Sequence, residues 1–264
     1  MHLASRPRAW NAVFAAAFGL ALPGALARPA AAVDLSAEPR SEANVVNPLF
    51  STWGPEAERV FRRENHHAKY AAEIHYDLAL WFYERQDYDL SLEHYRRAAE
   101  IDPDFPEAYF GIGLLFYTLG DDDNAAKYYE QALTKNPLDP DVRNNLGLIY
   151  YRRGELDRAR TEIEEALRLR EDFPDALYNL GLVFYQKQQL QSARTQFERA
   201  LTQDPTYVRA RFNLGVVYFE LGELDRAAEQ WRKVEESAPG TPLADQARDN
   251  LATLNSASAP DKKK

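Results

Sequence analysis

The chain has 264 residues, of which 45% are hydrophobic, 12% aromatic and 28% charged, and it contains no cysteine. The absence of cysteine excludes disulfide bonds, thiolate catalysis and cysteine-ligated zinc sites. The formal net charge of −9 argues against nucleic acid as a partner and against adsorption to an anionic membrane surface.

Residues 1–32 have the three-part composition of a secretory signal peptide. Two arginines form a positive start, and an apolar run follows over residues 9–22. This run is shorter than the roughly 20 apolar residues that a membrane span needs. Small residues at Ala25 and Ala27, and again at residues 30–32, offer two cleavage positions, after Ala27 and after Ala32. We therefore expect an exported protein, periplasmic or secreted, with no transmembrane segment after the signal is removed.

The segments next to the signal and at the C-terminus are expected to lie outside the main fold. Residues 33–54 are interpreted as a linker, because proline, glycine, serine and asparagine interrupt every potential helix. The linker contains one apolar patch at residues 45–53. Residues 55–71 predict an extra helical segment, either separate from the next helix or continuous with it. Residues 255–264, which end in three lysines, are expected to form a disordered tail.

A helical pattern with a period of 34 residues fills the chain between these ends, over residues 72–254. The landmark that ends each unit recurs without insertion at Pro103, Pro137, Glu171, Pro205 and Pro239. A fixed period of this length predicts a solenoid of stacked units instead of one globular core. The expected units are 72–105, 106–139, 140–173, 174–207 and 208–241, followed by a cap helix at 242–254.

Each unit is predicted to hold two amphipathic helices joined by a short turn. Small residues recur on the first helix, as at Gly147, and on the second helix, as at Ala159. Small side chains at facing positions predict that the two helix backbones approach closely. A larger residue at either position is expected to overpack the pair, at a cost of roughly 1–3 kcal/mol.

The order of small, aromatic, alanine and proline landmarks over 34 residues resembles the tetratricopeptide repeat, or TPR. Residues 179–185 and 213–219 look like the first helix of that repeat. The resemblance implies an all-α fold: a right-handed α-solenoid of five 34-residue helix–turn–helix repeats with a C-terminal cap helix. It also implies a non-enzymatic scaffold for protein–protein interaction that needs no cofactor and no metal. In this family the first helices line a concave groove where ligands lie.

By this resemblance, four rows of first-helix residues form a partner-binding groove. The asparagine row resembles a ladder that grips an extended peptide, because an amide both donates and accepts hydrogen bonds. Asparagine is also common at these places for structural reasons. The predicted groove residues are Tyr76, Leu80, Tyr83, Phe110, Leu114, Tyr117, Asn145, Leu148, Tyr151, Tyr178, Asn179, Leu182, Tyr185, Phe212, Asn213, Val216 and Phe219.

One row, from Leu80 to Val216, is aliphatic in all five units. A helix that is apolar on nearly every side is normally covered. We therefore expect the groove to hold something apolar: a partner peptide, another subunit, or the patch at residues 45–53. The alternative is a narrow exposed groove whose tyrosines shield the aliphatic side chains.

Catalysis and metal binding have little support in the sequence. His66, His67, His75 and His94 lack the spacing of a helical metal pair, and no phosphate loop or nucleophile elbow occurs. Aromatic residues stand where a clamp for a terminal carboxylate needs lysine or arginine. Two other functions stay open: a self-assembling component of an envelope secretion, pilus or polysaccharide-export machine, and a carbohydrate-binding protein suggested by the aromatic groove.

Overall fold

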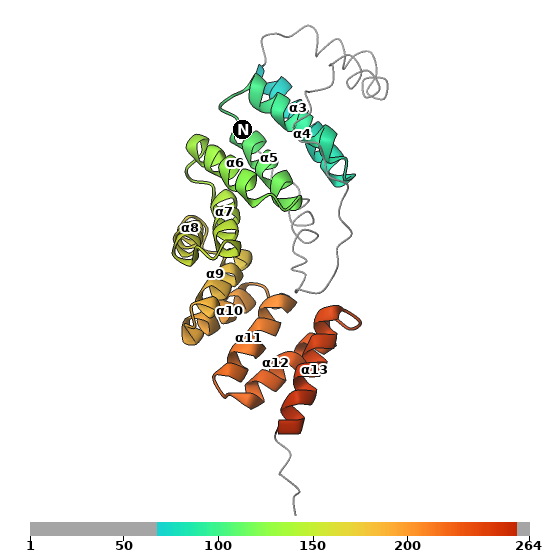
Figure 1. Cartoon of the computed structure of the whole chain (residues 1–264), viewed down its shortest axis with the longest axis vertical. Coiled ribbons are helices and arrows are strands. Elements are labelled where there is room, and N and C mark those ends of the chain that lie inside the picture. Colours follow the sequence, from blue (N-terminus) through green and yellow to red (C-terminus); the bar gives the residue numbers. More distant parts are fainter. Residues whose placement is uncertain (1–67, 258–264) are drawn as a thin grey trace, which may run out of the picture. The chain divides into compact units, whose positions relative to one another are not determined.

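A computed structural model describes residues 68–257 of the protein (Figure 1). This range contains eleven α-helices and no strand. The predictions for residues 1–67 and 258–264, including the signal peptide and the linker, lie outside the described residues. The helices are α3 (Ala68–Glu84), α4 (Tyr88–Ile101), α5 (Pro106–Thr118), α6 (Asp122–Lys135), α7 (Pro140–Arg152), α8 (Leu156–Leu169), α9 (Pro174–Gln186), α10 (Leu190–Gln203), α11 (Val208–Glu220), α12 (Leu224–Ser237) and α13 (Pro242–Ala257).

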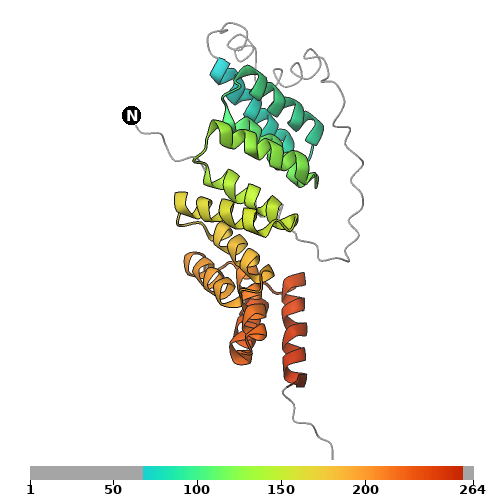
Figure 2. The same ribbon diagram turned by 60° about the vertical axis from the view of Figure 1, so that its left-hand side comes forward.

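The described helices divide into two compact units, with the boundary between Pro137 and Leu138. The first unit holds the helix pairs α3–α4 and α5–α6, and the second holds α7–α8, α9–α10 and α11–α12. Within each unit the second helix of one pair packs against the first helix of the next. Helix α13 lies mainly against α12 at the end of the second unit (Figure 2). The repeat of paired helices that the period predicts is therefore present in each unit.

Proline and aspartate determine where many of these helices begin. Pro106, Pro140 and Pro174 are the first residues of α5, α7 and α9. Proline suits this position because its φ is already helical. It lacks a backbone N–H, but an N–H group at the first helical position would have no acceptor within the helix. Asp87 and Asp121 precede α4 and α6, and each side chain accepts a hydrogen bond from a backbone N–H of the first turn.

One helix boundary agrees with an alternative that the sequence left open, and one differs from the sequence expectation. Helix α3 begins at Ala68, so residues 68–71 of the predicted extra segment are continuous with the first-repeat helix. No glycine or proline interrupts the chain there. Helix α13 extends to Ala257, so residues 255–257 of the predicted tail are helical. The helix-breaking Pro260 comes only later.

Glycines on the first helices let the two helices of a pair approach closely. A Cβ atom added to Gly147 of α7 would lie 2.6 Å from Cγ1 of Ile163 and 3.1 Å from the backbone oxygen of Ala159 on α8. A Cβ atom at Gly181 would lie 2.5 Å from the ring of Phe197. The distances to Ile163 and Phe197 are shorter than a carbon–carbon contact allows, so the side chain opposite each glycine occupies the space of the missing Cβ.

The turn inside each helix pair contains a residue with a left-handed backbone. Gly154 and Gly222 have φ values of 76° there, and Gln188 has a φ value of 59° at the same repeat position. A residue with a Cβ atom is strained by roughly 1–2 kcal/mol in this conformation. The fourth repeat therefore carries a local strain that the third and fifth repeats avoid.

Replacing Gln188 by glycine is expected to stabilise the second unit by about 0.5–1 kcal/mol, because relief of the strain exceeds the extra entropy that glycine loses on folding. Urea unfolding measures this change. The matched control is Gly154→Gln, which we expect to destabilise the same unit by a similar amount. Unchanged midpoints in both variants would contradict the strain.

Candidate functional site

The predicted groove residues lie on the first helix of each pair, α3, α5, α7, α9 and α11, and so fall in both units. The side chains that are at most 9% exposed are Tyr76, Tyr83, Phe110, Leu114, Asn145, Leu148, Tyr178, Asn179 and Leu182. Those that are partly exposed are Leu80, Tyr117, Tyr151, Tyr185, Phe212, Asn213 and Val216. Phe219 is 43% exposed. The leucines at the centre of the aliphatic row are therefore buried, and aromatic residues provide much of the accessible surface.

In the first unit, the tyrosines of this set connect the two helix pairs. The hydroxyl groups of Tyr83 on α3 and Thr118 on α5 lie 2.6 Å apart. Thr118 donates its own proton to the carbonyl oxygen of Leu114, so Tyr83 is the donor in the first bond. The ring of Tyr76 meets the ring of Phe105 edge-on, with 5.5 Å between centroids. Both tyrosines therefore stabilise the stacking of the repeats.

In the second unit, asparagines make equivalent links between consecutive repeats. The side-chain nitrogen of Asn179 donates to the side-chain oxygen of Asn144 over 2.9 Å. The side-chain nitrogen of Asn213 donates to the hydroxyl oxygen of Tyr178 over 3.1 Å. Each bond joins residues 35 positions apart. Burial raises the pKa of Tyr178 to about 12, so the phenol stays neutral.

Asn145 differs from the other two asparagines of its row. Its side chain on α7 is 5% exposed, and its side-chain nitrogen has no hydrogen-bond partner in the described part of the chain. A buried donor without an acceptor costs about 1–3 kcal/mol. Among the three asparagines of this row, Asn145 alone therefore keeps a buried amide N–H group without an acceptor in the described part of the chain.

The acidic residues at the edge of the predicted groove are engaged within the second unit. Asp141 accepts a hydrogen bond from Arg170 over 2.5 Å, and Asp175 accepts one from the hydroxyl of Tyr207 over 2.7 Å. Burial and the nearby carboxylate raise the pKa of Tyr207 well above its usual value. The guanidinium of Arg209 lies 5.5 Å from the centre of the same ring. These groups hold the first turns of α9 and α11 together.

A buried histidine pair in the first unit has no counterpart in the sequence predictions. The Nδ1 atoms of His75 on α3 and His94 on α4 lie 2.8 Å apart, and the two side chains are 6% and 2% exposed. The ring of His94 also stacks on the ring of Phe82. Burial lowers the pKa of each histidine to about 4, so both are neutral at physiological pH.

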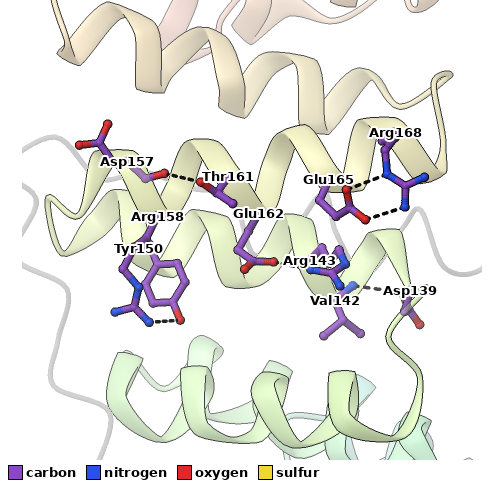
Figure 3. Close-up of polar contacts among 10 residues, drawn as sticks. All are labelled: Asp139, Val142, Arg143, Tyr150, Asp157, Arg158, Thr161, Glu162, Glu165 and Arg168. Carbon is purple, nitrogen blue, oxygen red and sulfur yellow. Dashed lines mark hydrogen bonds and ion pairs between the residues drawn. The ribbon is translucent and has the colours of Figure 1, made fainter.

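The same pair of positions, 19 residues apart, carries complementary side chains in other repeats. Arg143 and Glu162 form an ion pair of 2.8 Å between α7 and α8 (Figure 3). Arg211 donates to Gln230 over 3.4 Å between α11 and α12. Comparing residues at this spacing would have revealed the histidine pair from the sequence, because the spacing connects the facing sides of two paired helices.

The side chains brought together here offer hydrogen bonds from amides and phenols next to apolar surface. Within residues 68–257, no group of three or more histidine, aspartate or glutamate side chains is placed to hold a metal ion. No helix in that range combines the length and the apolar character needed to cross a membrane.

Solved structures with similar folds are numerous. The PilF protein of Pseudomonas aeruginosa is 21% identical, with a TM-score of 0.62 over 72% of this chain and 91% of that chain. YrrB, described as a TPR protein with an unusual peptide-binding site, is 22% identical, with a TM-score of 0.57 over 74% and 98%. MamA of Desulfovibrio magneticus RS-1 is 20% identical, with a TM-score of 0.58 over 65% and 97%. At these identities the likeness shows the fold.

Family models match the repeats directly. A tetratricopeptide-repeat model matches residues 110–172, 144–208 and 178–242, and a second model, described as a TPR repeat, matches residues 79–120. No curated protein sequence matches the chain significantly. The family matches cover more than half of the chain, and the paired helices follow the same period. The chain therefore belongs to the tetratricopeptide-repeat family.

Proposed function

We propose that the protein is a non-enzymatic interaction scaffold that binds an extended segment of a partner protein along the first helices of its second unit. The observation that carries this proposal is the unsatisfied amide of Asn145. A peptide carbonyl oxygen is the acceptor that this N–H group lacks, and every extended peptide presents one at regular intervals.

The surroundings of Asn145 fit such a ligand. Leu148, one helical turn further along α7, is 4% exposed, and Tyr151 is partly exposed beside it. Apolar side chains next to a single polar anchor favour a ligand whose own side chains are apolar or aromatic. YrrB, which has a similar fold, is described as carrying a peptide-binding site, so a ligand of this kind is compatible with the architecture.

Replacing Asn145 by leucine separates binding from folding. We expect partner affinity to fall by roughly tenfold, the worth of one hydrogen bond at about 1.4 kcal/mol. Stability should be unchanged or higher, because the variant removes a buried donor that lacks an acceptor. Isothermal titration with the captured partner and urea unfolding measure the two quantities.

The matched control is Asn144→Leu on the same helix. Asn144 already accepts the hydrogen bond of Asn179, so this change should destabilise the fold. Equal affinities of the Asn145→Leu variant and the parent chain would rule out the amide as an anchor. The substitutions Leu148→Asp and Leu182→Asp would test partner binding less well. Both leucines are buried, and a buried charge would unfold the unit before binding could be measured.

We also propose that the protein works in the periplasm or elsewhere in the cell envelope. The composition of residues 1–32 supports export. The partner is therefore sought in an envelope fraction, with the processed chain as bait. N-terminal sequencing of the chain recovered from that compartment should read from residue 28 or residue 33. Recovery of the unprocessed chain from the cytoplasm alone would contradict export.

A second candidate function is self-assembly into an envelope structure. It is favoured by Phe219 and Leu224, two large apolar side chains that are each 43% exposed near the end of the second unit. Light scattering of the purified chain over a range of concentrations tests it. A mass that stays monomeric at every concentration would exclude this function and leave partner binding untouched.

A further inference from the structure

Helix α3 exposes an apolar position that other repeats bury completely. Trp81 is 41% exposed, whereas Leu115, Val183 and Val217, which occupy the same repeat position, are 0% exposed. Those three residues lie on helices that pack against a preceding helix pair in their own unit. Helix α3 has no preceding pair within the described residues. Trp81 therefore lies on the terminal face of the described array.

Two further residues extend this face along α3. Ile74 and Leu78 are partly exposed, and with Trp81 they form one stripe because their spacings are four and three residues. We call these three residues the α3 terminal face. The residues at the first two positions on α5, α9 and α11 are at most 4% exposed; they are Ala108, Ile112, Ala176, Leu180, Ala210 and Leu214.

We propose that the α3 terminal face binds residues 53–61 of this same chain. That segment carries Trp53, Val60 and Phe61, all within 15 residues of Ala68 in α3. An array of stacked repeats needs its apolar end covered to remain soluble. The segment supplies apolar side chains for that purpose, and its docking does not depend on how the second unit binds a partner.

The length of the connection allows this docking. Trp81 lies about 20 Å along the helix from Ala68, at about 1.5 Å per residue. The chain from Trp53 to Ala68 can span up to about 50 Å when extended and about 22 Å as a helix. Trp53 can therefore reach Trp81. Covalent attachment also gives the segment an effective concentration of the order of millimolar, which favours it over a second copy.

Basic residues that follow the segment are complementary to acidic residues beside the α3 terminal face. Arg62 and Arg63 follow the apolar residues of the segment, and Glu73 and Asp77 flank the α3 terminal face. Opposite charges at the rim of an apolar contact orient it, although exposed pairs add little binding energy. The same charges disfavour an acidic partner at this face.

The absence of cysteine in the chain makes crosslinking a clean way to identify the occupant. The full chain with Leu78→Cys and Phe61→Cys, oxidised mildly, is expected to form a disulfide within one chain, with a yield independent of protein concentration. The control carries Phe61→Cys with Lys127→Cys on the exposed side of α6. A disulfide between chains that increases with concentration would overturn the proposal in favour of a second copy, and equal yields in the control would overturn it as non-specific.

Hydrogen exchange tests the docking without requiring one particular cysteine pair to meet. In the full chain, Trp53→Asp with Phe61→Asp is expected to speed exchange of the α3 amides roughly tenfold, because the covering segment is released. Ala37→Asp, in the same part of the chain outside the segment, should leave those amides unchanged. Unchanged α3 exchange in the double variant would overturn the proposal.

Discussion

Acidification to about pH 4 is expected to destabilise the first unit by several kcal/mol through the buried pair His75 and His94. Each histidine has a pKa lowered to about 4 in the folded protein, from 6.5 for an exposed imidazole. Desolvation by burial is the largest cause for both, and for His75 the neighbouring His94 and Arg97 add to it. The difference is worth about 3 kcal/mol for each histidine.

The direction of the effect follows from proton binding. Below pH 6.5 the unfolded chain takes up protons that the folded pair does not, so acid favours unfolding. The folded first unit has its full stability, with respect to this pair, above pH 6.5, and it loses that stability as the pH falls towards 4. The two Nδ1 atoms can share one proton in a hydrogen bond, but two N–H groups would face each other in the doubly protonated pair. We therefore expect the free energy of unfolding to fall by more than the contribution of one histidine and by less than the sum of both.

Nuclear magnetic resonance titration of the imidazole protons and urea unfolding at several pH values measure this prediction. The control variant, His75→Leu with His94→Gln, copies the residues Leu177 and Gln196 at the same positions of the fourth repeat. It should lose the pH dependence of the first unit over this range. Imidazole pKa values near 6.5 in the folded parent chain would show that the pair is not buried as described.

A leucine at Gly147 is expected to destabilise the second unit by roughly 2–3 kcal/mol, the upper part of the range for an overpacked core. The new side chain would occupy the space of Ile163, which is 0% exposed, and would press on the backbone of α8. The helix propensity gained by replacing glycine, about 1 kcal/mol, offsets only part of this cost. Thermal or urea unfolding gives the difference.

The matched variant adds Ile163→Ala to Gly147→Leu and so exchanges the large and small sides of the contact. It should recover part of the lost stability, because the volume in the α7–α8 interface is restored. If the double variant is no more stable than the sum of the two single changes predicts, the close contact between positions 147 and 163 is not the cause.

The fold could be predicted closely because its determinants are periodic. The 34-residue period and the prolines at 106, 140 and 174 specify where the first helices begin, and Gly147 and Ala159 specify where helices approach. The sequence left open whether residues 68–71 are continuous with the first-repeat helix, because they carry no helix breaker. The strained turn at Gln188 also escaped prediction, although the glycines 34 residues to either side, Gly154 and Gly222, mark that repeat position as left-handed.

The candidate site could be predicted only in part. The sequence identified the residues of the first helices, but it could not show which neighbours cover them. Leu148 and Leu182 are buried, and Asn179 is bonded to Asn144, so these side chains are less available than their pattern indicated. Asn145 has the same side chain as Asn179 and Asn213 and differs from them only because its amide N–H group lacks an acceptor. The presence of an acceptor depends on the three-dimensional structure and cannot be predicted from the residue type.

The bonds between residues 35 positions apart have a consequence for how the gene can change length. Each bond joins one repeat to the next at a constant offset, so loss of a whole repeat supplies a new partner of the same kind. If residues 174–207 were deleted, Asn213 would follow Asn144 at the distance in sequence that Asn179 has now. Recombination between repeats could therefore shorten or lengthen this array while the amides that link consecutive repeats stay paired.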